Sequence, residues 1–259
     1  DGHTVTADDI ESISIASLGK STDSTHTIKL AADAMTKLTI TGGSEELVIT
    51  YADTTLETIA ASAYTGDLDL SGVTLSDDGA TITTGKGDDT IETGNGDDVV
   101  NAGAGDDTIT ILGTSSDDDL TLGAGADTIV WDGTVAVDGT VTVNVSDFAF
   151  GEDGDVLKLD ISKFDAYNAT DAAVVINASI ATALSDLDDA AAVKNYIVAD
   201  TSANLASLDL SADTDDVYLV YETDTGNLYA VDDQAFTAAS LIGNLGVGAL
   251  TADNLAFQA

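Results

Sequence analysis

A nine-residue repeat between Gly85 and Ile129 constrains the fold of this chain more than any other feature. Three consecutive blocks read TGKGDDTIE, TGNGDDVVN and AGAGDDTIT, and a two-residue insertion, Ile111-Leu112, separates them from GTSSDDDLT and LGAGADTIV. In each block small residues lead to an aspartate, and an apolar residue follows two positions later. A flexible Gly/Asp-rich linker is the competing interpretation. It does not explain why five blocks keep an aspartate and an apolar residue at fixed places, so we favour a stacked repeat fold.

The glycines and aspartates of the repeat predict a tight turn followed by a very short strand. Glycine adopts backbone angles that other residues disfavour, so Gly85 and Gly87 would turn the chain and direct carbonyl oxygens toward one point. Asp89 would add a carboxylate there, while Ile91 would point the other way into an apolar core. The next block would do the same on the opposite side. About eighteen residues would then complete one coil, with turns stacked one strand spacing apart.

Stacked carboxylates repel one another unless a cation lies between them. Ca²⁺ takes six to eight oxygen ligands, and carboxylate and carbonyl oxygens are the ligands that it prefers. Alternate blocks would pair Asp89 with Asp107, Asp98 with Asp118, and, if the insertion is absorbed in a strand, Asp107 with Asp127. We therefore predict about three Ca²⁺ ions in the block. Their expected binding residues are Gly85, Gly87, Asp89, Gly94, Gly96, Asp98, Gly103, Gly105, Asp107, Ser116, Asp118, Gly123, Gly125 and Asp127.

These blocks resemble the repeats-in-toxin (RTX) nonapeptide, Gly-Gly-x-Gly-x-Asp-x-apolar-x, which folds as a parallel β-roll. The resemblance is strong over residues 84–110 and fair over 122–130. It is weak over 113–121, where Thr114 and Ser116 replace both turn glycines. The resemblance implies a secreted, extracellular protein with Ca²⁺ as its cofactor, exported by the type I secretion machinery. Such a chain would stay unfolded at low calcium and fold outside the cell.

The segments on either side of the repeat differ from it in character. Residues 1–80 contain short alternating apolar runs, with Leu38, Leu47 and Leu56 nine residues apart, and predict a degenerate β-solenoid that continues into the RTX block at 81–131. Residues 132–259 predict a β-rich C-terminal cap that includes the type I secretion region. The expected fold class is therefore all-β, a parallel β-roll or β-helix solenoid with such a cap.

Two elements of the cap are predicted from local signals. Residues 185–196 begin with a serine N-cap and acidic residues and continue with alanines, which predicts a helix. Two apolar runs, 217–221 and 228–231, flank the turn sequence TDTGN and predict a hairpin. Other acidic turns could help to bind Ca²⁺, but we interpret them as solvated loops. They lie at 77–79, 152–155, 213–216 and 232–233.

Composition excludes several classes of function. The chain has 47 acidic and 7 basic residues, so its net charge of −40 opposes compaction unless cations neutralise part of it. Nucleic acids and anionic membranes need basic patches, so neither is an expected partner. Cysteine is absent, and the two histidines, His3 and His26, belong to no catalytic motif. Neither H-E-x-x-H nor G-x-S-x-G occurs, so we expect no enzyme activity in this chain.

The composition and the solenoid-like lead-in resemble RTX-type bacterial surface-layer proteins. That resemblance implies a structural protein that self-assembles on the cell surface when calcium is present. Its expected partners are further copies of itself and, through the rest of the chain, outer-membrane lipopolysaccharide. Two alternatives remain open. The chain could be the C-terminal RTX module of a type I-secreted adhesin, or the calcium and secretion module of an extracellular hydrolase whose catalytic domain lies upstream.

Overall fold

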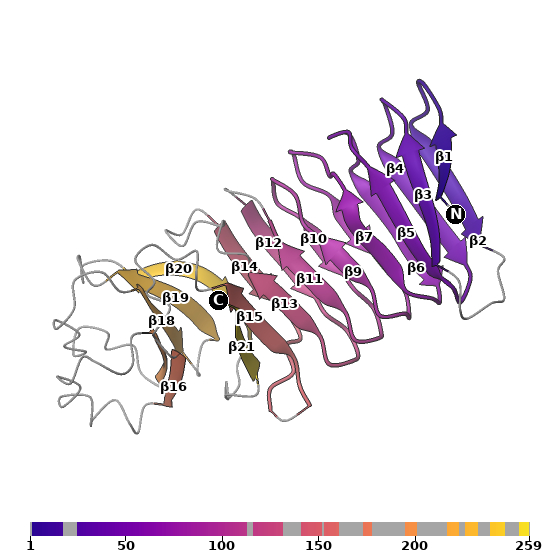
Figure 1. Cartoon of the computed structure of the whole chain (residues 1–259). Coiled ribbons are helices and arrows are strands. Elements are labelled where there is room, and N and C mark those ends of the chain that lie inside the picture. Colours follow the sequence, from indigo (N-terminus) through magenta and orange to yellow (C-terminus); the bar gives the residue numbers. More distant parts are fainter. Residues whose placement is uncertain are drawn as a thin grey trace.

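The computed structural model describes residues 2–17, 25–112, 116–131, 141–151, 153–160, 173–177, 195–200, 217–222, 226–232, 239–246 and 254–258. Within these ranges the regular elements are β-strands, and up to Asp160 they alternate along the chain between two sheets (Figure 1). The prediction of an all-β parallel solenoid is confirmed. The described ranges contain no helix with the length and apolar character that a bilayer span requires.

The first sheet contains the odd-numbered strands up to β15 and the C-terminal strand β21. Every pairing in this sheet is parallel. In spatial order its strands are β1 (Gly2–Thr6), β3 (Thr25–Ala31), β5 (Glu46–Tyr51), β7 (Leu68–Val73), β9 (Thr90–Glu92), β11 (Thr108–Ile111), β13 (Thr128–Trp131), β15 (Val156–Asp160) and β21 (Leu255–Gln258).

The second sheet contains the even-numbered strands of the solenoid and most of the C-terminal strands. In spatial order they are β2 (Ser12–Ser17), β4 (Lys37–Gly42), β6 (Thr58–Tyr64), β8 (Thr81–Thr83), β10 (Val99–Asn101), β12 (Ser116–Thr121), β14 (Val141–Val145), β20 (Ala239–Asn244), β19 (Asn227–Asp232), β18 (Val217–Glu222), β17 (Asn195–Asp200) and β16 (Ala173–Asn177). Strand β19 is antiparallel to both of its neighbours, so the hairpin predicted for β18 and β19 is confirmed.

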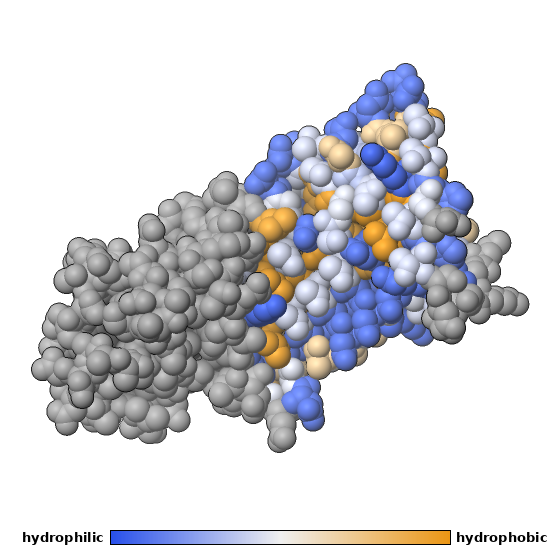
Figure 2. All heavy atoms as spheres, viewed as in Figure 1, coloured by the Kyte–Doolittle hydropathy of each residue, from blue (hydrophilic) through white to orange (hydrophobic). Residues whose placement is uncertain are grey.

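The hydrophobic core lies between the two sheets and is continuous along the rod. Alternate residues of each strand point inward, so equivalent positions of successive coils stack in columns. One such column contains Leu38, Ile59, Ile82, Val100 and Leu120, all of which are buried. Burying each of these side chains stabilises the fold by roughly 1.5–3 kcal/mol. In the coloured part of Figure 2, hydrophilic and neutral residues cover most of the viewed face, with apolar patches among them.

The N-terminal coils continue into the repeat, as the sequence predicts, but their nine-residue spacing is only partly right. Strands β6 and β7 pair with β8 and β9, so one core runs through both segments. Leu38 and Leu47 do lie on successive strands, β4 and β5. The residue that stacks on Leu38 is however Ile59, because Leu56 lies before the start of β6. The extra residues lie in the connection between β5 and β6, at 52–57, because Leu38 already pairs with Ile59 before the register shift that follows Thr39.

The predicted helix at 185–196 is wrong at its end. Its residues 185–194 lie outside the described ranges, and the described parts of the cap contain no helical element. Asn195 and Tyr196 begin β17 and pair with β16 in parallel. The run from Tyr196 through Ile197 and Val198 is aromatic and β-branched, which favours a strand over the end of a helix.

A candidate metal centre formed by stacked aspartates

Each repeat turn ends in a short polar run whose last residue is a buried aspartate. Asp89, Asp98, Asp107, Asp118 and Asp127 are each no more than 1% exposed. Each lies two residues before an inward-facing apolar side chain, as the sequence predicts for Asp89 and Ile91. Strand alternation points both side chains of such a pair to the interior. The fold therefore places a column of carboxylates beside the apolar core rather than on its surface.

Hydrogen bonds connect these aspartates from coil to coil. The backbone N–H of Asp89 donates to Oδ1 of Asp107 at 2.7 Å, and the N–H of Asp107 donates to Oδ1 of Asp127 at 2.8 Å. On the other sheet the N–H of Asp98 donates to Oδ1 of Asp118 at 3.0 Å. The three pairs predicted from the sequence are thus direct neighbours. We call this set of stacked, buried carboxylates the aspartate ladder.

The second oxygen of three ladder aspartates has no protein donor. In the described part of the chain, Oδ2 of Asp107, Asp118 and Asp127 is buried and makes no hydrogen bond. A buried polar atom without a partner costs free energy, and such an atom in a native fold calls for an ion or a water. These three atoms belong one each to the pairs 89/107, 98/118 and 107/127. The donor set therefore fits a hard cation in each of the three gaps.

The aspartates at the N-terminal start of each column differ in this respect. Asp89 accepts hydrogen bonds from the N–H groups of Leu68 and Gly85, at 2.8 and 3.1 Å. Asp98 accepts from Ala80 and Gly94, both at 2.7 Å. Both oxygens of each carboxylate are therefore occupied by backbone donors. The ladder begins with carboxylates that the protein satisfies, and the atoms that lack partners lie further along it.

Burial raises the pKa of the ladder carboxylates far above the ordinary aspartate value. Desolvation raises the pKa of Asp107 to about 8, and the charges of Asp89 and Asp127 add to the increase, although the Asp89 N–H opposes it. Desolvation likewise raises the pKa of Asp118 to about 7, and those of Asp89 and Asp127 to about 6. Without a cation, these carboxyls therefore keep their protons to a higher pH than an ordinary aspartate does. A bound divalent cation has the opposite effect, because it stabilises the ionised form.

Close backbone contacts between stacked turns explain the repeat glycines. A Cβ atom on Gly105, whose φ is +131°, would lie 2.2 Å from the carbonyl oxygen of Gly87. A Cβ on Gly87 would in turn lie 2.2 Å from the backbone of Gly66. The turns also bond directly, since the N–H of Ala104 donates to Gly85 O at 3.0 Å. All eight predicted glycines lie in turns outside the strands, namely Gly85, Gly87, Gly94, Gly96, Gly103, Gly105, Gly123 and Gly125.

Ser116 does not occupy a turn, contrary to the prediction. It is the first residue of β12, pairs with Val141, and has a buried hydroxyl without a hydrogen-bond partner among the described residues. Residues 113–115 lie outside the described ranges. The insertion is partly absorbed in a strand, because Ile111 extends β11 and pairs with Trp131. The longer strands β11 and β12 keep Asp118 in register with Asp98, although a serine has replaced the turn glycine.

Asp155 extends the ladder beyond the predicted residues. We interpreted the acidic turn at 152–155 as a solvated loop, but Asp155 is only 2% exposed. Its Oδ1 accepts from the N–H of Asp127 at 2.9 Å, and its Oδ2 accepts from Ala149 at 2.6 Å. The signal in the sequence was Leu157, an apolar residue two positions after the aspartate, as in every repeat block. By contrast, Asp77 and Asp78 are exposed, in agreement with a solvated turn.

A second series of aspartates, which the sequence analysis missed, lies on the exposed side of the same turns. The N–H of Asp88 donates to Asp67, that of Asp106 donates to Asp88, and that of Ala126 donates to Asp106, all at 2.8–2.9 Å. In each bond the N–H group belongs to one coil and the accepting carboxylate to the coil before it. The paired letters DD in the first three repeat blocks were the available signal. The first aspartate of each pair connects turns at the surface, and the second enters the ladder.

Backbone oxygens must complete any metal site in this ladder. No group of three or more acidic or histidine side chains converges within the described ranges. Each gap lies between carboxylates of two coils, so backbone carbonyl oxygens would have to supply the remaining ligands. A mixture of carboxylate and carbonyl ligands suits Ca²⁺ better than it suits transition metals.

A comparison with protein-family models decides what the block is. Residues 76–109 and 110–130 match the family described as RTX calcium-binding nonapeptide repeat (4 copies). The block consists of RTX repeats. Calcium is therefore the cation of this centre, and the RTX match covers all five ladder aspartates from Asp89 to Asp127. Asp155 lies outside the matched residues. No curated protein and no solved structure matches the chain.

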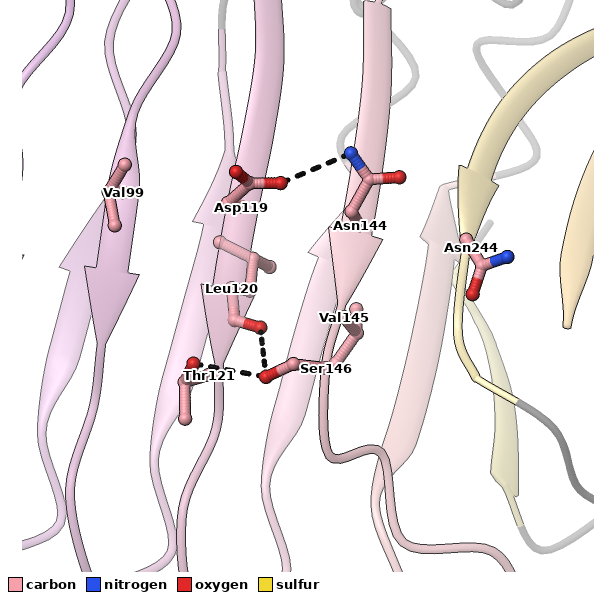
Figure 3. Close-up of a pocket in the computed structure, with 8 residues that line it drawn as sticks. All are labelled: Val99, Asp119, Leu120, Thr121, Asn144, Val145, Ser146 and Asn244. Atoms are coloured by element: carbon pink, nitrogen blue, oxygen red, sulfur yellow. Dashed lines mark hydrogen bonds between the residues drawn. The ribbon is translucent and has the colours of Figure 1, made fainter.

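An open groove of about 570 Å³ on the outer face of the second sheet is not part of the RTX centre. Figure 3 shows Asp119 and Asn144 on neighbouring strands, joined by a 3.2 Å hydrogen bond from the Asn144 amide. The hydroxyls of Thr121 and Ser146 lie 3.0 Å apart and also bridge these strands. Among the described lining residues no buried polar atom lacks a partner. The groove therefore gives no argument for a second ligand.

Proposed function

We propose that this chain is a calcium-dependent structural module of a bacterial cell surface that assembles with copies of itself in a surface layer. The observation that carries the proposal is the set of three carboxylate oxygens that are buried without a hydrogen-bond partner among the described residues. A fold that buries such groups depends on cations for its stability. Calcium then acts as a structural ligand and as a signal of the extracellular environment, rather than as a cofactor for chemistry.

The charge of the chain supports this role. A net charge of −40 keeps the chain extended where calcium is scarce, because its carboxylates repel one another. Proteins with RTX repeats are typically exported by type I secretion and are extracellular. Calcium outside the cell would neutralise the ladder and allow the rod to form. Carboxylate repulsion would thus keep the chain unfolded during export, and its neutralisation by calcium would let the chain fold outside the cell.

The N-terminal end of the rod supports assembly. Strands β1 and β2 are the last strands of their sheets in the described part of the chain (Figure 1). Neither strand contains an acidic residue, although the chain as a whole is strongly acidic. Val5 and Ile10 at this end are 41% and 43% exposed. Exposed strand backbone without acidic residues is a template for pairing with a further strand, either of this protein or of a second copy, and Asp8, Asp9 and Glu11 in the adjoining turn are the exposed charges that such pairing must accommodate.

Electron microscopy of the purified chain tests the proposed assembly. The chain is dialysed from a chelator into millimolar Ca²⁺ and, in parallel, into the same concentration of Mg²⁺. Ordered sheets or filaments that form only with Ca²⁺ support the surface-layer role. A chain that folds with Ca²⁺ but stays monomeric at high concentration contradicts it and favours the adhesin or hydrolase module instead.

A further inference from the structure

The last described turn of the solenoid, residues 149–151 and 153–155, contacts a side chain from the C-terminal part of the chain. Asn254 is completely buried. Its amide nitrogen lies 2.8 Å from the carbonyl oxygen of Asp155, 3.3 Å from that of Gly151 and 3.4 Å from that of Ala149. Its Oδ1 accepts from the N–H of Gly151 at 3.0 Å. The partners are about one hundred residues away in the sequence, so this contact connects the two ends of the cap region.

The arrangement of these partners fixes the orientation of the amide. Three carbonyl oxygens surround one end of the side chain and an N–H group faces the other, so only one placement of nitrogen and oxygen satisfies them all. Oxygens that converge in this way are also what a bound calcium ion requires. In this turn the neutral amide of Asn254 supplies hydrogen-bond donors where the three carbonyl oxygens converge.

We propose that Asn254 replaces a cation in the final turn, so that the protein itself ends the aspartate ladder. The same side chain holds the C-terminal strand β21 against β15, because it immediately precedes Leu255, which pairs with Leu157. Asn254 is a positioning residue in this account. It closes the last coil without calcium and thereby sets the number of ions that the ladder takes.

The neighbouring aspartate agrees with this assignment. Both oxygens of Asp155 accept backbone hydrogen bonds, from Asp127 and from Ala149. Asp107 and Asp127, which lie further inside the ladder, each keep one oxygen without a partner among the described residues. In the last turn, backbone N–H groups therefore satisfy the carboxylate of Asp155, and the Asn254 amide satisfies the carbonyl oxygens. The geometry of this turn also differs, since the donor to Asp155 Oδ2 lies six residues before it, against four for Asp89.

Substitution of the amide by a carboxylate gives a direct test. Asn254→Asp removes the amide donors and places a carboxylate against three carbonyl oxygens, an arrangement that requires a bound cation or protonation of the carboxyl and, at pH 8 with saturating Ca²⁺, favours the cation. Native mass spectrometry at saturating Ca²⁺ should then count one more ion per chain than in the wild type. Asn254→Ala should leave the count unchanged. Asn101→Asp is the matched control for charge, because it adds a carboxylate at an exposed position of β10.

Hydrogen exchange of the C-terminal strand provides the second readout. At saturating Ca²⁺ the amides of 255–258 should exchange at least about tenfold faster in Asn254→Ala than in the wild type, while β9 and β11 keep their protection. Asn254→Asp should lose that protection at low Ca²⁺ and regain it at high Ca²⁺. An unchanged ion count in Asn254→Asp overturns the proposal, as does wild-type exchange in Asn254→Ala. Failure of both variants to fold at saturating Ca²⁺ also overturns it, because a cation then cannot take the place of the amide.

Discussion

The backbone N–H of Asp89 donates to Oδ1 of Asp107 at 2.7 Å, while Oδ2 of the same carboxylate is buried without a partner in the described structure. One oxygen of Asp107 therefore serves the fold and the other is available to an ion. Asp107→Asn keeps an acceptor for Asp89 and removes the charge. We expect it to lower calcium affinity about tenfold or more, because ligand charge tunes such sites.

The same variant should be more stable than the wild type when calcium is chelated, because it no longer buries a carboxylate. Thermal unfolding at pH 8, with and without Ca²⁺, measures both effects. Asp106→Asn is the matched control, since Asp106 is exposed and adjacent in the sequence. Equal behaviour of the two variants would contradict the separate roles of the exposed and buried aspartates.

The stability of the calcium-free protein should fall as the pH rises from about 4 to about 8. The pKa of Asp107 is raised to about 8 and that of Asp118 to about 7, so the folded state binds more protons than the unfolded state across this window. Stability is then greatest below the unfolded pKa and is lost as pH rises through the folded values. With Ca²⁺ the trend should reverse, because calcium binds the ionised carboxylates. Urea titrations at pH 5 and pH 8 in chelator and in Ca²⁺ test the sign of both slopes.

Two glycine substitutions separate backbone strain from steric contact. Gly105→Ala introduces a Cβ 2.2 Å from Gly87 O, so it must push two stacked turns apart and should destabilise the fold by about 3 kcal/mol or more. Gly151 also has a positive φ, but its Cβ would meet nothing within 4 Å. Gly151→Ala should therefore cost only the backbone strain, about 1–2 kcal/mol. Equal losses of stability in urea titrations would show that the turns are not held by close stacking.

Removal of calcium should affect the two parts of the solenoid differently. In the two coils before Asp89, the position equivalent to this aspartate is a buried leucine, first Leu47 and then Leu68. Those coils are stabilised by apolar burial and need no ion. Hydrogen exchange in chelator should show protection lost first in residues 85–131 and retained longer in 37–73. Simultaneous loss throughout, at the same chelator concentration, would contradict this order.

The sequence predicted the stacked architecture because its repeat fixes two quantities at once. The interval from Asp89 to Asp107 gives the coil length, and the interval from Asp89 to Ile91 shows which side chains point inward. These intervals, together with the assumption that the insertion Ile111-Leu112 is absorbed, were sufficient to identify the three aspartate pairs. They could not show that Asp107 keeps one oxygen without a donor, because this depends on the backbone of the preceding coil.

Features without a local period could not be predicted. The connection between β5 and β6, at 52–57, interrupts the nine-residue spacing, so Ile59 takes the place expected for Leu56. The contact of Asn254 with Gly151 joins residues that no spacing relates. Ser116 was assigned to a turn because it aligns with a glycine, whereas its alternation with Asp118 and Leu120 marks a strand.

The most direct test of the account counts calcium ions in a triple variant, Asp107→Asn, Asp118→Asn and Asp127→Asn. These are the three aspartates whose Oδ2 has no partner within the described ranges. Isothermal titration calorimetry and native mass spectrometry should show that about three ions per chain are lost relative to the wild type. Circular dichroism should show that strand formation no longer depends on calcium. An unchanged ion count, or a wild-type protein that folds equally well in chelator at pH 8, would contradict the account.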